Sequence, residues 1–187
     1  MHPSEDRQMN RIPTRVSKAT VFWPSLIVIV LSDVVTKYLA HTRIVPFRPP
    51  REIVGEAVRL TLAYNPGAAF GLHVGPFSRW IFLITTVLAL WVLARLYRGT
   101  VPGDSVRALA LGLVCGGALG NLINRIWSSA GVVDFIDVGV GDARWPTFNV
   151  ADIGVSVGAV LLAWVLWRED RRIARNAIAN PESSQSC

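Results

Sequence analysis

Residues 150–167 read VADIGVSVGAVLLAWVLW, an apolar run whose one charged residue is Asp152. Its length is close to the roughly 20 residues that a helix needs to cross a bilayer. Three further apolar blocks of similar length lie at residues 21–40, 77–97 and 108–126. Four such blocks in 187 residues, of which 51% are hydrophobic, favour an all-α membrane protein with four transmembrane helices over a soluble helical protein.

The first block is predicted to stay in the mature protein. It contains Asp33 and Lys37, and no clear small-residue cleavage site follows it, so it differs from a cleavable signal peptide. The four blocks define a membrane domain at residues 20–168, between polar tails at 1–19 and 169–187. We expect outer loops at about 41–76 and 127–147. Within the first loop, residues 58–64 partly alternate like a strand, which predicts a small β-containing unit on the outer membrane surface.

The charge distribution predicts the orientation in the membrane. The chain has 19 basic and 13 acidic residues. The two tails and the loop between the second and third blocks carry eleven basic residues, whereas the other two loops carry five. The positive-inside rule then places both termini in the cytoplasm. This bias accounts for the basic composition without a nucleic-acid partner.

Metal and disulfide chemistry are not indicated. Cys115 lies inside the third block and Cys187 ends the chain, so the two cysteines are not expected to pair. The three histidines (His2, His41 and His73) are scattered and form no ligand pattern. We therefore expect no metal and no cofactor.

Polar residues within or beside the apolar blocks converge on one face of the membrane. In an up-and-down bundle, the first and third helices end at the face where the second and fourth begin. The polar residues near that face are Asp33, Lys37, Asn121, Asn124, Arg125, Asp134, Asn149 and Asp152. Because ionisable residues inside a membrane are costly, such a cluster predicts a functional site near the outer face.

Several members of this cluster also have a structural interpretation. Asp33 and Lys37 are spaced i, i+4 and can form an ion pair on one helix face. Asn149 can cap the fourth helix and still contact a substrate. Residues 65–71 (NPGAAFG) are either a plain turn or a site of close ligand approach.

Two further patterns fit a helical membrane protein. The small residues at 116–120 favour close helix packing. The seven tryptophans lie mostly near block ends, which is typical of an interfacial belt.

Five motifs in order resemble those of lipoprotein signal peptidase, also called signal peptidase II, an aspartic protease of the bacterial inner membrane. They are DVVTK (33–37), NPGAAF (65–70), GGALGN (116–121), VVDF (132–135) and FNVAD (148–152). The resemblance extends over about residues 21–167. It implies that Asp134 and Asp152 are the catalytic pair. The residues implied to position substrate or the pair are Asp33, Lys37, Asn65, Gly67, Asn121, Arg125 and Asn149.

The resemblance also implies the reaction. Two nearby carboxylates share a proton and titrate as a coupled pair, so one can activate water while the other donates a proton. The implied substrate is a prolipoprotein whose cysteine carries a diacylglyceryl group, cleaved just before that cysteine. Membrane lipid is the other expected partner, and we expect a monomer. Asp137 and Asp142 are interpreted as solvated loop charges.

One motif position departs from the family. The third motif usually continues Asn-x-x-Asp-Arg, but here Asn124 stands where the aspartate is expected. We expect Asn124 still to accept a hydrogen bond from Arg125, although without charge assistance. Two alternatives to an active peptidase are a catalytically impaired homologue that binds lipoproteins and a small membrane transporter. The intact aspartate pair weighs against the first. The position of the polar cluster at one face, rather than along a path, weighs against the second.

Overall fold

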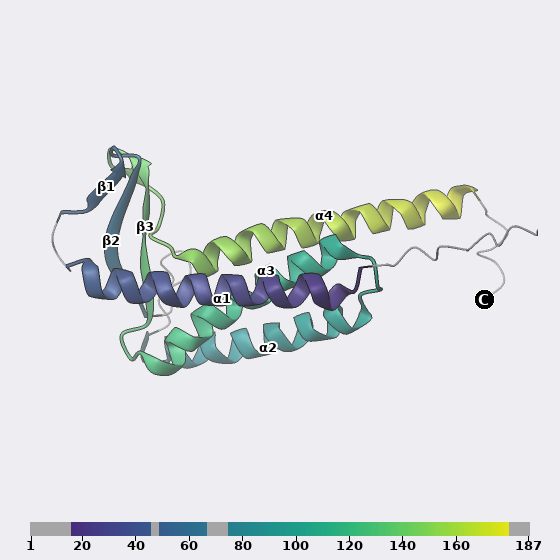
Figure 1. Ribbon diagram of the computed structural model, residues 1–187, viewed down its shortest axis with the longest axis horizontal. Helices are drawn as coiled ribbons and strands as arrows, with labels where there is room; N and C mark the ends of the chain where they lie inside the picture. The colour runs from purple at the N-terminus through teal and green to yellow at the C-terminus, as the bar shows by residue number, and fades with distance from the viewer. Residues whose placement is uncertain (1–15, 46–48, 67–74, 180–187) are drawn as a thin grey trace, which may run out of the picture.

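Four long helices run side by side along the molecule (Figure 1). The computed structural model describes residues 16–45, 49–66 and 75–179. The helices are α1 (Lys18–Arg43), α2 (Ser78–Gly99), α3 (Ser105–Trp127) and α4 (Val150–Ala179), and each is long and apolar enough to cross a membrane. The predicted all-α membrane fold is thus confirmed. Helix α4 continues past residue 168, into the segment assigned to the C-terminal tail; the domain boundaries themselves stay a prediction.

Helix α3 forms the centre of the bundle and packs against the other three helices. Glycines on α3 permit the close approach. A Cβ atom on Gly117 would lie 2.2 Å from the carbonyl oxygen of Ala151 on α4, and one on Gly120 would lie 2.5 Å from Asp33 Oδ2 on α1. Both distances are too short for real contacts, so α1 and α4 reach these positions because residues 117 and 120 have no side chain.

A small antiparallel sheet stands across one end of the bundle (Figure 1). Its strands are β1 (Arg51–Val54), β2 (Val58–Asn65), β3 (Val132–Val140) and β4 (Ala143–Arg144), in the order β1-β2-β3-β4. The strand expected at residues 58–64 is confirmed as β2. The β2–β3 register pairs Ala63 with Asp134 and Asn65 with Val132. The sheet therefore brings the first outer loop beside Asp134.

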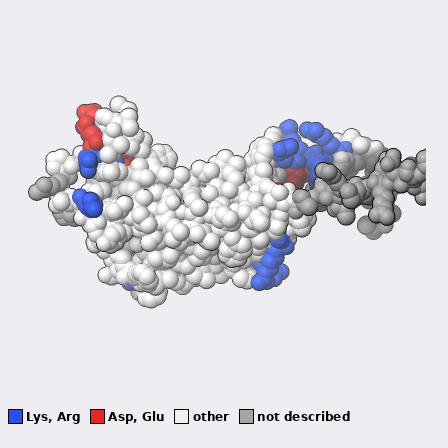
Figure 2. All heavy atoms as spheres, in the orientation of Figure 1, with Lys and Arg blue, Asp and Glu red and all other residues white. Residues whose placement is uncertain are grey.

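The surface has the charge pattern of a membrane-spanning protein. Figure 2 shows lysine and arginine at the two ends of the molecule and a broad uncharged band between them. All seven tryptophans are substantially exposed, from Trp164 at 43% to Trp127 at 85%. Exposed aromatic rings near the ends of such a band are typical of a membrane interface.

Two basic side chains cap the C-terminal ends of α2 and α3. The Lys18 ammonium donates hydrogen bonds to the carbonyl oxygens of Tyr97, Arg98 and Thr100 at the end of α2. At the opposite end of the bundle, Arg79 donates to the carbonyl oxygens of residues 125 and 126, at the end of α3. These bonds satisfy carbonyls that have no partner within their own helix. They also place positive charge at the negative end of each helix dipole.

Candidate active site

Asp152 is fixed at the first turn of α4 by a reciprocal pair of hydrogen bonds with Asn149. Asn149 Oδ1 accepts from the Asp152 backbone N–H at 3.0 Å, and Asp152 Oδ2 accepts from the Asn149 backbone N–H at 3.1 Å. This is the geometry of a capping box, which satisfies two donors that a helix start leaves open. The capping role expected of Asn149 is present, and it orients the Asp152 carboxylate.

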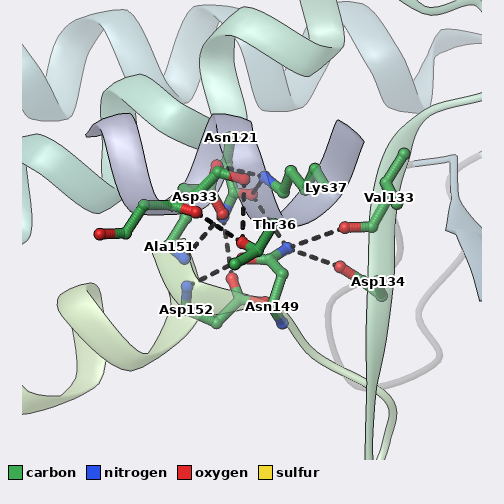
Figure 3. Close-up of polar contacts among 10 residues, drawn as sticks. Asp33, Thr36, Lys37, Asn121, Val133, Asp134, Asn149, Ala151 and Asp152 are labelled. Atoms are coloured by element: carbon green, nitrogen blue, oxygen red, sulfur yellow. Dashed lines mark hydrogen bonds and ion pairs between the residues drawn. The ribbon is translucent and has the colours of Figure 1, made fainter. Parts of the chain in front are cut away.

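The side-chain amide of Asn149 joins this helix end to β3 and α3. Its Nδ2 donates to Asp134 Oδ1 at 2.6 Å and to Asn121 Oδ1 at 3.2 Å, with a weaker contact of 3.4 Å to the carbonyl of Val133. Asn149 is fully buried. Figure 3 shows it between Asp152 and Asp134. One amide therefore links the two aspartates that the motifs singled out.

Asn121 on α3 forms a second link. Its Nδ2 donates to Asp152 Oδ1 at 2.8 Å, and its Oδ1 accepts from Lys37 Nζ at 2.9 Å. The Lys37 ammonium thus donates to the amide oxygen of Asn121, while the amide nitrogen of Asn121 donates to the Asp152 carboxylate. The Lys37 charge strengthens Nδ2 as a donor, because hydrogen bonds in a chain polarise one another.

Asp33 and Lys37 form the ion pair that their spacing predicts. Lys37 Nζ lies 2.7 Å from Asp33 Oδ2, and the exposed fractions of the two side chains are 4% and 0%. Asp33 Oδ1 also accepts a hydrogen bond of 2.9 Å from the Ala151 backbone N–H at the start of α4. A carboxylate at a helix start is favourable for the helix dipole. The pair therefore ties α1 to the first turn of α4, which also carries Asp152.

Asp134 on β3 is 4% exposed. Burial, with the negative charge of Asp152 nearby, raises the pKa of Asp134 to about 6, although hydrogen bonds from Asn149 and Asn65 act in the opposite direction. A carboxyl group with this pKa is partly protonated near neutral pH. The two aspartates thus have different environments, which is the arrangement that separates an acid from a base.

Not every expected site residue joins this network. Arg125 lies with its guanidinium 5.6 Å from the centre of the Phe82 ring. Arg125 Nε and Asn124 Oδ1 are both buried and have no hydrogen-bond partner among the described residues. The expected hydrogen bond between these neighbours is therefore wrong for this structure. Gly67 lies outside the described residues.

The interpretation of Asp137 as a solvated charge is also wrong. Asp137 is 6% exposed. Arg59 Nε donates to its Oδ2 at 3.0 Å and Arg144 Nε to its Oδ1 at 2.9 Å. Burial by itself would raise the pKa of Asp137, but these two guanidinium groups hold it below its ordinary value. The β2–β3 register places Arg59 directly opposite Asp137, which a loop assignment could not show. Asp142 is exposed, as expected.

Sequence reasoning missed the main-chain members of the site. The Ala151 N–H and the Val133 carbonyl both contact site side chains, but main-chain atoms leave no residue-type pattern to read. Within residues 16–45, 49–66 and 75–179, no group of three or more histidine, cysteine or acidic side chains is placed to hold a metal ion.

Comparison with known proteins gives a consistent result. A family model described as Signal peptidase (SPase) II matches residues 25–168. The lipoprotein signal peptidase of Hydrogenovibrio crunogenus is 38% identical over 175 residues, which cover 88% of this chain and 95% of that protein. The lipoprotein signal peptidase of Syntrophomonas wolfei is 36% identical over 156 residues, covering 83% and 99%. A bacterial membrane enzyme solved by the in meso method at 2.3 Å resolution is 30% identical, with a TM-score of 0.70 over 79% of this chain and 87% of that one.

The fold and these similarities define a multi-pass membrane protein of the aspartic peptidase class. Within that class, the chain belongs to the signal peptidase II family, the family of the lipoprotein signal peptidases.

Proposed function

We propose that this protein removes signal peptides from diacylglyceryl-modified bacterial prolipoproteins by cleaving just before the lipidated cysteine. The observation that carries the proposal is the Asn149 amide, which holds Asp134 on β3 at 2.6 Å while its backbone N–H and side-chain oxygen fix Asp152 on α4. The buried carboxyl group of Asp134 and the half-buried one of Asp152, joined in this way, supply the acid and the base of an aspartic peptidase.

The environments of the two carboxyl groups assign their roles. Asp152 accepts two N–H donors, from Asn121 Nδ2 and the Asn149 backbone, and it lies at the positive end of the α4 dipole. These features stabilise a negative charge, so Asp152 acts as the base. Burial raises the pKa of Asp134 to about 6, so Asp134 acts as the acid. Lys37 acts through Asn121 as a positioning residue for Asp152.

In the first step, Asp152 takes a proton from water as the water oxygen bonds to the scissile carbonyl carbon, and Asp134 gives its proton to the carbonyl oxygen. In the second step, protonated Asp152 gives its proton to the leaving amine as the C–N bond breaks. Asp134 regains a proton from the collapsing intermediate. The products are the carboxyl terminus of the signal peptide and the free amine of the lipidated cysteine. We propose that Asn65, Gly67 and Arg125 position the substrate.

The place of the site in the fold supports a membrane-bound substrate. Asp152 lies at the start of α4 and Asp134 in the sheet across the end of the bundle (Figure 1), so the scissile bond would sit at the bilayer edge. A signal helix within the membrane and a lipid-anchored cysteine would both meet that edge. We place the protein in the bacterial inner membrane, with the sheet at the outer face and both termini in the cytoplasm. It would act as a monomer without a cofactor, with residues 20–168 as its peptidase domain.

The test is a cleavage assay with purified protein and a synthetic diacylglyceryl-modified prolipoprotein peptide, with products identified by mass spectrometry. We expect Asp134→Asn and Asp152→Asn each to abolish cleavage, because groups that act as a unit fail together. Asp142→Asn removes an exposed carboxylate outside the network and serves as the matched control, with unchanged cleavage. Near-normal turnover by a folded Asp134→Asn or Asp152→Asn variant would contradict the assignment of these two residues as the catalytic pair. Equal cleavage of the peptide without its lipid would contradict the proposed substrate.

A further inference from the structure

A groove of about 750 Å³ lies between the start of α3 and the last part of α4, at the end of the bundle opposite the candidate active site. At 1.5 Å per residue, the 30 residues of α4 extend about 45 Å, whereas the hydrocarbon core of a bilayer is roughly 30 Å thick. The final part of α4 therefore extends beyond the hydrocarbon region, and the groove lies at the height of the lipid headgroups.

The lining of the groove changes from apolar to basic along α4. Trp164, Val165 and Trp167 line the part nearer the bundle centre, together with Val106 of α3. Beyond them the wall carries four arginines, Arg168, Arg171, Arg172 and Arg175. Figure 2 shows basic side chains gathered at this end of the molecule. A phospholipid in the bilayer has the same order, with apolar acyl chains followed by a charged headgroup.

Two of these arginines are held in place by aromatic rings. The Arg168 guanidinium lies 4.7 Å from the centre of the Trp164 ring, and the Arg171 guanidinium lies 4.5 Å from that of Trp167. Such stacking leaves the N–H groups at the edge of each guanidinium free to bind an anion. The groove thus presents positioned donors, not a freely moving cluster of charges.

The acidic residues of the groove do not neutralise the arginines. Asp104 and Glu169 both pair with Arg107 of α3. In contrast, none of the four groove arginines forms an ion pair or a hydrogen bond with a side chain of the described segments. The groove therefore has a net positive charge.

We propose that this groove binds one anionic phospholipid, with its phosphate against Arg168 and Arg171 and its acyl chains along Trp164 and Val106. Membrane-surface arginines attract anionic lipid, and the tryptophan rings give one lipid a defined position. The proposal does not depend on the peptidase reaction, because the groove lies at the other end of the bundle.

The test titrates the purified full-length protein in mild detergent with phosphatidylglycerol or with phosphatidylcholine of the same acyl chains. Bound lipid is counted by native mass spectrometry. We expect one phosphatidylglycerol to bind at least tenfold more tightly than phosphatidylcholine. Arg168→Gln with Arg171→Gln should weaken phosphatidylglycerol binding about 25-fold, at roughly fivefold per arginine near a membrane surface.

The matched control is Arg95→Gln with Arg98→Gln. These arginines lie at the same end of the bundle on α2, outside the groove, and Arg95 also stacks on a tryptophan, 5.8 Å from the Trp91 ring centre. The control should change affinity less than threefold. Equal losses in the two variants, or equal affinity of the unchanged protein for both lipids, would overturn the proposal. So would binding of the water-soluble glycerophosphoglycerol headgroup as tightly as the lipid. If circular dichroism shows that the groove variant is unfolded, the single variants Arg168→Gln and Arg171→Gln repeat the test, each with an expected loss of about fivefold.

Discussion

Replacing Lys37 by methionine should destabilise the protein strongly. The side chain of Lys37 is 4% exposed, and its ammonium lies 2.7 Å from the fully buried carboxylate of Asp33. Lys37→Met keeps the length of the side chain but leaves a buried carboxylate without its countercharge. Breaking a buried pair in this way costs about 3–5 kcal/mol, so the free energy of unfolding should fall by about that amount.

The double variant Asp33→Asn with Lys37→Met should be more stable than Lys37→Met by itself. Asparagine keeps an oxygen that can accept from the Ala151 N–H, which Asp33 binds at 2.9 Å, and no unpaired charge remains. The loss should then be below about 2 kcal/mol, from the Lys37 hydrogen bonds to Asp33 and Asn121, at about 1 kcal/mol for each lost bond.

Denaturant titration in mild detergent, followed by circular dichroism, measures these differences. The cleavage assay separates the structural role of Lys37 from its positioning role. We expect the double variant to regain stability but to cleave slowly, because Asn121 still lacks the ammonium that holds its oxygen. A double variant as unstable as Lys37→Met would refute the coupling between the two residues. Recovery of full activity together with stability would refute the positioning role.

Three further outcomes are expected. Because the protonated form of Asp134 is the acid and its pKa is raised to about 6, cleavage should fall as pH rises above about 6, by roughly tenfold per unit; rates that still climb through pH 7 would contradict this. Asn124→Asp should cleave as fast as the unchanged protein or faster, since Asn124 Oδ1 forms no hydrogen bond with a site residue. An inactive Asn124 protein rescued fully by this change would make the position essential. A membrane-impermeant thiol reagent added outside the cell tests the orientation, in a Cys187→Ser background. It should label Asp142→Cys, in the β3–β4 turn, but not Pro102→Cys, in the α2–α3 turn. Equal labelling of the two would refute the placement of the sheet at the outer face.

Features fixed by neighbouring residues could be predicted from the sequence. The sequence predicts the four helices because about 20 apolar residues in a row suffice to specify a membrane span. The Asp33–Lys37 pair followed from i, i+4 spacing, and the capping role of Asn149 from its place before the fourth apolar block. Each of these depends on residues that lie close together in the chain.

The prediction was incomplete where partners come from distant parts of the chain. Residues 132–140 lie in a predicted loop but form the strand β3, because pairing with β2 supplies the main-chain hydrogen bonds that an isolated extended segment lacks. The same pairing buries Asp137 between two arginines. It also brings Asn65 to Asp134, so the sheet register decides which side chains meet.

The site also has features set by neighbouring residues and features set by distant ones. The sequence by itself determined that polar residues converge on one membrane face, since the direction of an up-and-down bundle follows from the order of its helices. Only the tertiary structure decided that Lys37 reaches Asp152 through Asn121 while Arg125 turns to Phe82. Asn121 and Arg125 lie on adjacent turns of one helix. Their different partners are set by how closely α1, α2 and α4 pack around α3, and that distance depends on glycines and side-chain volumes far apart in the chain.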